Sequence, residues 1–187
     1  MKASQKIRSS ILFLLLILLL VVSGCNKEQA AQTSVQNENL NYKFASNEYV
    51  EIIEKLMEYW ADQDFDAYGT LLAEDVISFA PYNPHEAGNE TWGREREMNI
   101  YKNWTKNNEV ENIEFSDISI VAIETEGNKP FYKESGINVM AFATMKMTIY
   151  GKPINHGISW IFHFNNEKLI DKIYLFFDAQ QQFNAMN

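Results

Sequence analysis

The sequence predicts an α+β domain in which helices precede strands. Two observations predict this class. Apolar residues recur at three- and four-residue steps up to about residue 106, and β-branched and aromatic runs separated by turn-forming residues occupy the chain from residue 114 onward. We therefore expect three N-terminal helices packed on one face of a curved, mostly antiparallel sheet.

The first predicted helix covers about four turns after residue 47. Ser46 or Asn47 is available to cap it, and Glu48 and Glu51 lie in the first turn, where acidic side chains favour a helix. Its apolar face contains six residues: Tyr49, Ile52, Ile53, Leu56, Met57 and Trp60.

Asp64 can cap a short second helix, which we expect to pack back on the first. Its apolar side carries Phe65, Tyr68, Leu71 and Leu72. A short strand over residues 76–80 comes next, and Pro81 and Pro84 end it.

A loop runs from there to Gly93, and the third helix is predicted over residues 94–106. This helix is expected to bury Met98, Tyr101 and Trp104.

The second half of the chain has the pattern of an antiparallel meander. Strands are predicted over residues 114–124, 136–150, 155–164 and 171–178, with turns between them. A C-terminal helix over residues 179–186 completes the predicted domain.

The N-terminus has the parts of an export signal. Lys2, Lys6 and Arg8 precede twelve apolar residues, 11–22, which are too few to span a bilayer as a helix. The small residues Ser23 and Gly24 then precede a cysteine.

The segment VSGC, residues 22–25, resembles the bacterial lipobox. This resemblance implies cleavage before Cys25, acylation of that cysteine with palmitate or a similar chain, and anchoring to a bacterial membrane. Asn26, and not an aspartate, follows the cysteine, so we expect the outer membrane or cell surface rather than the inner membrane. The domain organisation we expect is a signal peptide over 1–24, a lipidated cysteine with a flexible tether over 25–45, and a folded domain over 46–187. An uncleaved signal anchor or an ordinary secretory peptide is the alternative.

Charge and composition exclude several functions. The net charge is −9, and removal of the three basic residues of the signal gives −12, so nucleic acid is not expected as a partner. Cys25 is the only cysteine, which excludes an intramolecular disulfide. We expect no metal and no cofactor, because the three histidines are scattered and no glycine-rich phosphate loop is present.

Four short motifs resemble the nuclear transport factor 2-like superfamily, which includes SnoaL-like cyclases. They are residues 59–67 (YWADQDFDA), 71–76 (LLAEDV), 92–95 (WGRE) and 176–180 (FFDAQ). The resemblance implies a cone-shaped SnoaL-like fold over residues 46–187, with an apolar pocket and often a dimer, and we expect a homodimer.

The acid and base positions of the related enzymes are not kept in this chain. An overlay of the ketosteroid isomerase and SnoaL-like patterns places Leu56, Ala80, Trp160 and Leu175 at these positions. None of these side chains transfers a proton or stabilises an oxyanion, which argues against those reactions.

Asp178 is the catalytic candidate that remains, because it ends an apolar strand and matches an acidic position of SnoaL-like chains. It could act as a general base with Tyr174 or His85 assisting. The alternative, which we favour, is that Asp178 caps the C-terminal helix.

The aromatic and methionine content could line a ligand pocket. The predicted pocket residues are Trp60, Tyr82, His85, Trp92, Trp104, Met145, Trp160 and Tyr174. His156 and His163 are seven residues apart in one strand, so we expect them on opposite faces of the sheet.

The sequence thus favours a membrane-anchored lipoprotein whose domain binds a small hydrophobic or aromatic molecule or acts as a dimerising interaction module. The rival is an isomerase, dehydratase or hydrolase of a small hydrophobic substrate with Asp178 as general base.

Overall fold

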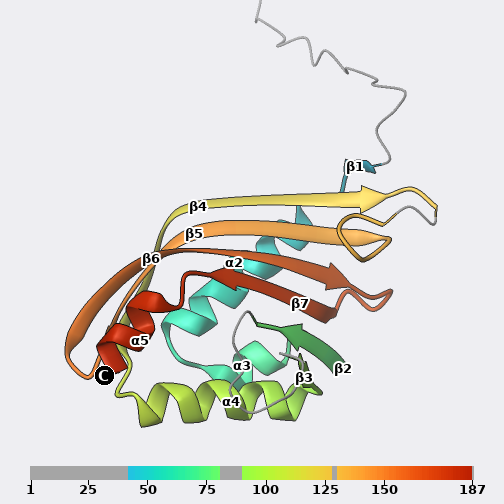
Figure 1. Cartoon of the computed structure of the whole chain (residues 1–187). Helices are drawn as coiled ribbons and strands as arrows, with labels where there is room; N and C mark the ends of the chain where they lie inside the picture. Colours follow the sequence, from blue (N-terminus) through green and yellow to red (C-terminus); the bar gives the residue numbers. More distant parts are fainter. Residues whose placement is uncertain (1–41, 81–89, 128–129, 187) are drawn as a thin grey trace, which may run out of the picture. The chain divides into compact units, whose positions relative to one another are not determined.

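The computed structural model describes residues 42–80, 90–127 and 130–186 (Figure 1). Leu40 to Asn187 form one compact unit. The predictions on the signal segment, on Cys25, on most of the tether, and on Tyr82 and His85 lie outside the described residues.

Seven strands of the described chain form one sheet in the order β1-β4-β5-β6-β7-β2-β3. All neighbouring pairs are antiparallel except β2 and β7, which are parallel. The strands are β1 (Tyr42–Phe44), β2 (Leu72–Phe79), β3 (Glu90–Trp92), β4 (Glu111–Thr125), β5 (Ile137–Ile149), β6 (Lys152–Phe164) and β7 (Ile170–Phe177).

Four helices of the described chain lie against this sheet or against one another (Figure 1). They are α2 (Glu48–Ala61), α3 (Phe65–Gly69), α4 (Arg94–Asn107) and α5 (Gln180–Met186). Helix α2 contacts β4 and β5, α4 contacts β2 and α3, and α5 contacts β5 and β6. The predicted α+β class, with three helices followed by a meander and a C-terminal helix, is confirmed.

The two faces of the sheet are set by the two-residue period of each strand. Odd-numbered residues of β5 from Val139 to Ile149 and even-numbered residues of β6 from Ile154 to Phe164 are buried, and they pair across the strands. They form the inner face, which packs on Ile53, Leu56 and Met57 of α2 in the core. His156 therefore lies on the inner face and His163 on the outer face, as predicted.

The outer face of the sheet leaves several apolar side chains in contact with solvent. Phe142 is 51% exposed, Phe176 is 41% exposed, and Ser159 of β6 is the cross-strand partner of both. At one end of this face, the segment around Glu134 covers β7, where the Tyr174 hydroxyl donates a hydrogen bond of 2.6 Å to the Glu134 carboxylate.

Three features of the sheet differ from the sequence prediction. The second helix ends at Gly69, and Leu72, which we assigned to it, begins β2 and pairs with Ile170; both side chains are fully buried. Glu90–Trp92 of the predicted loop forms β3, and Tyr42–Phe44 of the predicted tether forms β1. The start of β2 and all of β1 pair with strands that are distant in sequence, whereas β3 pairs with β2, the strand before it. Local periodicity does not show such pairings.

Candidate ligand cavity

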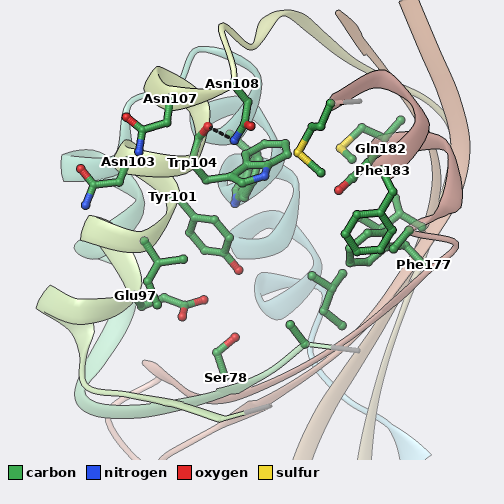
Figure 2. A pocket seen from close by; sticks show the side chains of 18 of the residues that line it. Ser78, Glu97, Tyr101, Asn103, Trp104, Asn107, Asn108, Phe177, Gln182 and Phe183 are labelled. Atoms are coloured by element: carbon green, nitrogen blue, oxygen red, sulfur yellow. Dashed lines mark hydrogen bonds between the residues drawn. The ribbon is translucent and has the colours of Figure 1, made fainter. Parts of the chain in front are cut away.

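A cavity of about 420 Å³ lies between α4, α5 and the inner face of the sheet (Figure 2). Its wall is mostly apolar. Trp60 at the end of α2, Met145 of β5, Ile158 and Trp160 of β6, and Leu175 of β7 contribute to it.

The strand residues reach the cavity because they share the inner face. Trp160 pairs with Leu175, and Ile158 pairs with Phe177, so these four side chains form two neighbouring cross-strand pairs. Helix α5 closes another side with Phe183 and Met186. The cavity is therefore bounded by elements from both halves of the chain.

One acidic side chain lies in this apolar wall. Glu97 of α4 is 2% exposed and lines the cavity together with Tyr101, one helical turn later, and Ser78 of β2 (Figure 2). Residues four apart on a helix share a face, so Glu97 and Tyr101 point to the same side of α4. Gly93, which has a φ of +89°, precedes the helix and accepts a backbone hydrogen bond from Glu97.

Three hydroxyl groups surround the Glu97 carboxyl. The Tyr68 hydroxyl of α3 donates to Glu97 Oε1 at 3.5 Å, and Tyr101 and Ser78 also form hydrogen bonds with the carboxyl. Burial raises the pKa of Glu97, these hydrogen bonds lower it in part, and the result is a pKa of about 7. Burial also raises the pKa values of Tyr68 and Tyr101 well above 10, so both stay neutral.

Amide side chains line another part of the cavity. Asn103, Asn107 and Asn108 project from the C-terminal half of α4 and the residue after it, and Gln182 comes from α5 (Figure 2). The Asn108 amide donates to the Trp104 carbonyl at 2.7 Å, which fixes its position at the helix end. These amides can donate and accept hydrogen bonds without adding charge to the cavity.

The structure brings four of the predicted pocket residues together in the cavity wall: Trp60, Trp104, Met145 and Trp160. Whether they bind a ligand stays a prediction. Trp92 and Tyr174 do not line the cavity. Trp92 pairs with Ile77 and is 56% exposed, and Tyr174 pairs with Ile161 and stacks on Phe79 at 4.7 Å, so both lie on the outer face.

Asp178 lies beside the helix that it was expected to cap. Its Oδ1 accepts a hydrogen bond from the Gln180 backbone N–H at 2.9 Å, and its side chain is exposed and does not line the cavity. This contact is the one that the capping hypothesis requires. The base hypothesis gains no support from the position of Asp178.

The two described histidines have different surroundings. His156 is buried behind Phe177, on which it stacks at 5.7 Å, and neither ring nitrogen has a hydrogen-bond partner among the described residues. Burial lowers its pKa, although Asp178 raises it in part. His163 contacts the Asp171 carboxylate at 2.5 Å on the outer face, away from the cavity.

The four positions that the overlay assigned to acids and bases contribute no titratable group to the cavity. Ala80, Trp160 and Leu175 line it, and Leu56 lies in the core. The acidic group comes instead from Glu97, which the sequence analysis did not select. The signal was present, because Glu97, Tyr101 and Trp104 follow a helical three- and four-residue spacing and so place a charge on the apolar side of α4.

In the described ranges, no group of three or more His, Cys, Asp or Glu side chains is placed to hold a metal ion.

Solved structures with the same fold come from several organisms. A candidate polyketide cyclase from Xanthomonas campestris superposes with a TM-score of 0.57 at 15% identity, covering 74% of this chain and 96% of its own. An NTF2-like protein from Burkholderia xenovorans superposes with a TM-score of 0.56 at 15% identity, covering 78% of this chain and 100% of its own. An LEH-like epoxide hydrolase from M. tuberculosis superposes with a TM-score of 0.51 at 15% identity, covering 75% of this chain and 90% of its own.

The domain thus has the α+β NTF2-like fold that the sequence motifs implied. No family model matches the sequence, and comparison with curated proteins gives no match either. Identities of this size establish the fold alone.

Glu97→Gln is expected to change how stability depends on pH. Because the folded pKa of about 7 lies above the ordinary value of 4.5, the contribution of Glu97 to stability is complete below pH 4.5 and is lost as pH rises through 7. This difference between the two pKa values corresponds to about 3 kcal/mol in the free energy of unfolding. In urea unfolding of residues 40–187, the free energy of unfolding of the variant should therefore rise relative to that of the native sequence between pH 5 and pH 8.

Glu95→Gln is the matched control, because Glu95 is exposed on the same helix and the change removes the same charge. Its stability should follow the native curve. Parallel curves for all three proteins would contradict the assignment of a neutral-range pKa to Glu97.

Proposed function

We propose that this domain binds a small, largely apolar or aromatic molecule in the cavity. The observation that carries the proposal is a cavity of about 420 Å³ whose mostly apolar wall holds one cluster of hydrogen-bonding groups around Glu97. Ligand sites in proteins combine these two properties, since apolar walls supply affinity and a few polar groups fix orientation.

An interaction role is compatible with ligand binding, and we propose that two copies associate through the outer face of the sheet. The exposed apolar side chains Phe142, Phe176 and Val121 support this, because apolar patches on an exposed sheet face are typical of interfaces.

Native mass spectrometry of residues 40–187 tests both proposals. Protein purified without detergent should carry an additional small-molecule mass that disappears on unfolding, or should acquire one from a library of apolar aromatic compounds. Leu175→Trp should prevent this by filling the cavity, whereas Phe176→Trp on the outer face should not. A bare protein mass after exposure to the library would contradict binding, and a monomer at every concentration would contradict the dimer.

A second candidate function is proton-transfer catalysis on the bound molecule, with Glu97 in the role that we first considered for Asp178. A carboxyl with a pKa of about 7 can accept and donate a proton at neutral pH. The carboxylate would take a proton from one atom of the substrate and return it to another atom of the same molecule, so no further reactant is required. Tyr101 and Ser78 could donate hydrogen bonds to the intermediate.

Deuterium incorporation tests this catalysis whatever the product is. The ligand identified by native mass spectrometry should gain deuterium at carbon when incubated with the protein in D₂O. Glu97→Gln should slow the exchange at least a hundredfold, in keeping with the usual effect of losing a general base. Equal exchange with the native protein and the variant would contradict the enzyme hypothesis.

We also propose that the protein is a bacterial lipoprotein anchored through Cys25, on the outer membrane or cell surface. The support is the signal-like N-terminus with its lipobox-like segment. In the part of the chain that the structure describes, the helices are too short or too polar to cross a membrane. The multiple acyl chains of a lipoprotein would supply a firm anchor.

Metabolic labelling with an alkyne-tagged palmitate tests the anchor in a bacterial host. The native chain should incorporate the label and sediment with membranes, and Cys25→Ala should lose the label. Labelling of Cys25→Ala, or membrane attachment without any label, would contradict lipidation at Cys25.

A further inference from the structure

The described lining of the cavity offers the Glu97 carboxyl hydrogen bonds but no positive charge. Its partners are the hydroxyls of Tyr68, Tyr101 and Ser78. Among the described residues that line the cavity, none is a lysine, arginine or histidine. A buried carboxylate without a counter-ion is unfavourable, because three hydroxyl groups replace its lost hydration only in part.

Glu97 is also the acidic group that dominates the charge of the cavity near neutral pH. Among the described residues, the titratable groups that contact it are Tyr68 from α3 and Tyr101 from its own helix, and β2 contributes Ser78, which does not titrate. Burial raises the pKa of both tyrosines, so they remain uncharged. The other polar side chains in the described wall are amides, which do not change charge with pH.

Aromatic rings line the cavity and pack on the tyrosines that contact the carboxyl. Trp60 packs edge-on against Tyr101 at 4.6 Å between ring centroids, and Tyr101 packs against Tyr68 at 5.9 Å. Trp104 and Trp160 also line the cavity. Aromatic rings, and indoles most of all, attract cations through their electron-rich faces.

We propose that the cavity selects ligands that carry a protonated amine on a small apolar or aromatic body, and that the Glu97 carboxylate is the counter-ion of that amine. This inference rests on the proposed ligand-binding function. An anionic ligand would be repelled by Glu97 and by the net charge of −9. A neutral ligand would leave the carboxyl without a counter-ion, whereas an ammonium group would supply one.

The proposal has a consequence for the pH dependence of binding. An amine requires the ionised form of Glu97, so binding at or below pH 7 releases a proton from the carboxyl. Affinity for an amine should therefore fall about tenfold from pH 8 to pH 6. A neutral ligand that accepts a hydrogen bond from the protonated carboxyl would show the opposite trend.

Matched ligand series test the proposal with residues 40–187, the compact unit that contains the whole described core. The probes are aryl-ethylamines, aryl-ethanols and aryl-propanoates, each with one, two and three fused rings. Binding is measured by isothermal titration calorimetry at pH 6, 7 and 8. We expect the amine of the best-fitting ring size to bind at least tenfold more tightly than its alcohol at pH 8, and the propanoates to bind most weakly.

Two variants test whether the Glu97 carboxyl causes the preference for amines. Glu97→Gln should lose the preference for the amine over the alcohol and the pH dependence of amine binding. Glu95→Gln, which removes an exposed charge from the same helix, should behave as the native protein.

The possible failures are distinguishable. Binding of alcohols or propanoates as tight as that of amines, or amine binding that is independent of pH, would overturn the inference and leave the ligand-binding function in place. Absence of binding across all nine probes would overturn the inference together with the proposed function.

Discussion

The burial of the Glu97 carboxyl is the constraint on which the rest of the site depends. A carboxyl that is 2% exposed needs hydrogen-bond partners, and it finds them on three separate elements: Tyr68 on α3, Tyr101 on α4 and Ser78 on β2. These elements must therefore converge at one end of the cavity. The polar cluster connects α4 with α3 and β2, and the apolar part of the cavity lies beside it.

The buried carboxyl lowers the stability of the fold when it ionises, and it is useful only if the site has a function for it. A pKa of about 7 means that ionisation of Glu97 costs the fold about 3 kcal/mol at alkaline pH, against a typical total of about 5–15 kcal/mol for a domain. A glutamine or an apolar residue would fill the same position without this cost of ionisation. A ligand that pairs with the carboxylate, or a reaction that uses its proton, explains why a titratable group at this position is useful.

The sequence predicts the parts of the molecule that rest on local patterns. The helices α2 and α4, the Asp64 cap of α3, the four long strands and the opposite faces of His156 and His163 all follow from residue spacing. The parallel pairing of β2 with β7 does not, because it joins residues almost a hundred positions apart. Glu97 falls between these cases: its helical spacing is visible in the sequence, but its tyrosine partner on α3 is supplied only by the fold.

The measurement that tests this account most directly is a titration of the Glu97 carboxyl by NMR. Residues 40–187 labelled with ¹³C at the glutamate side-chain carboxyl would be followed from pH 4 to pH 9, and the Glu97 resonance would be identified by its absence in Glu97→Gln. We expect a midpoint of about 7 for this resonance, well separated from those of the exposed glutamates. A midpoint near the ordinary value of 4.5 would contradict the burial of the carboxyl, and with it the site that we propose.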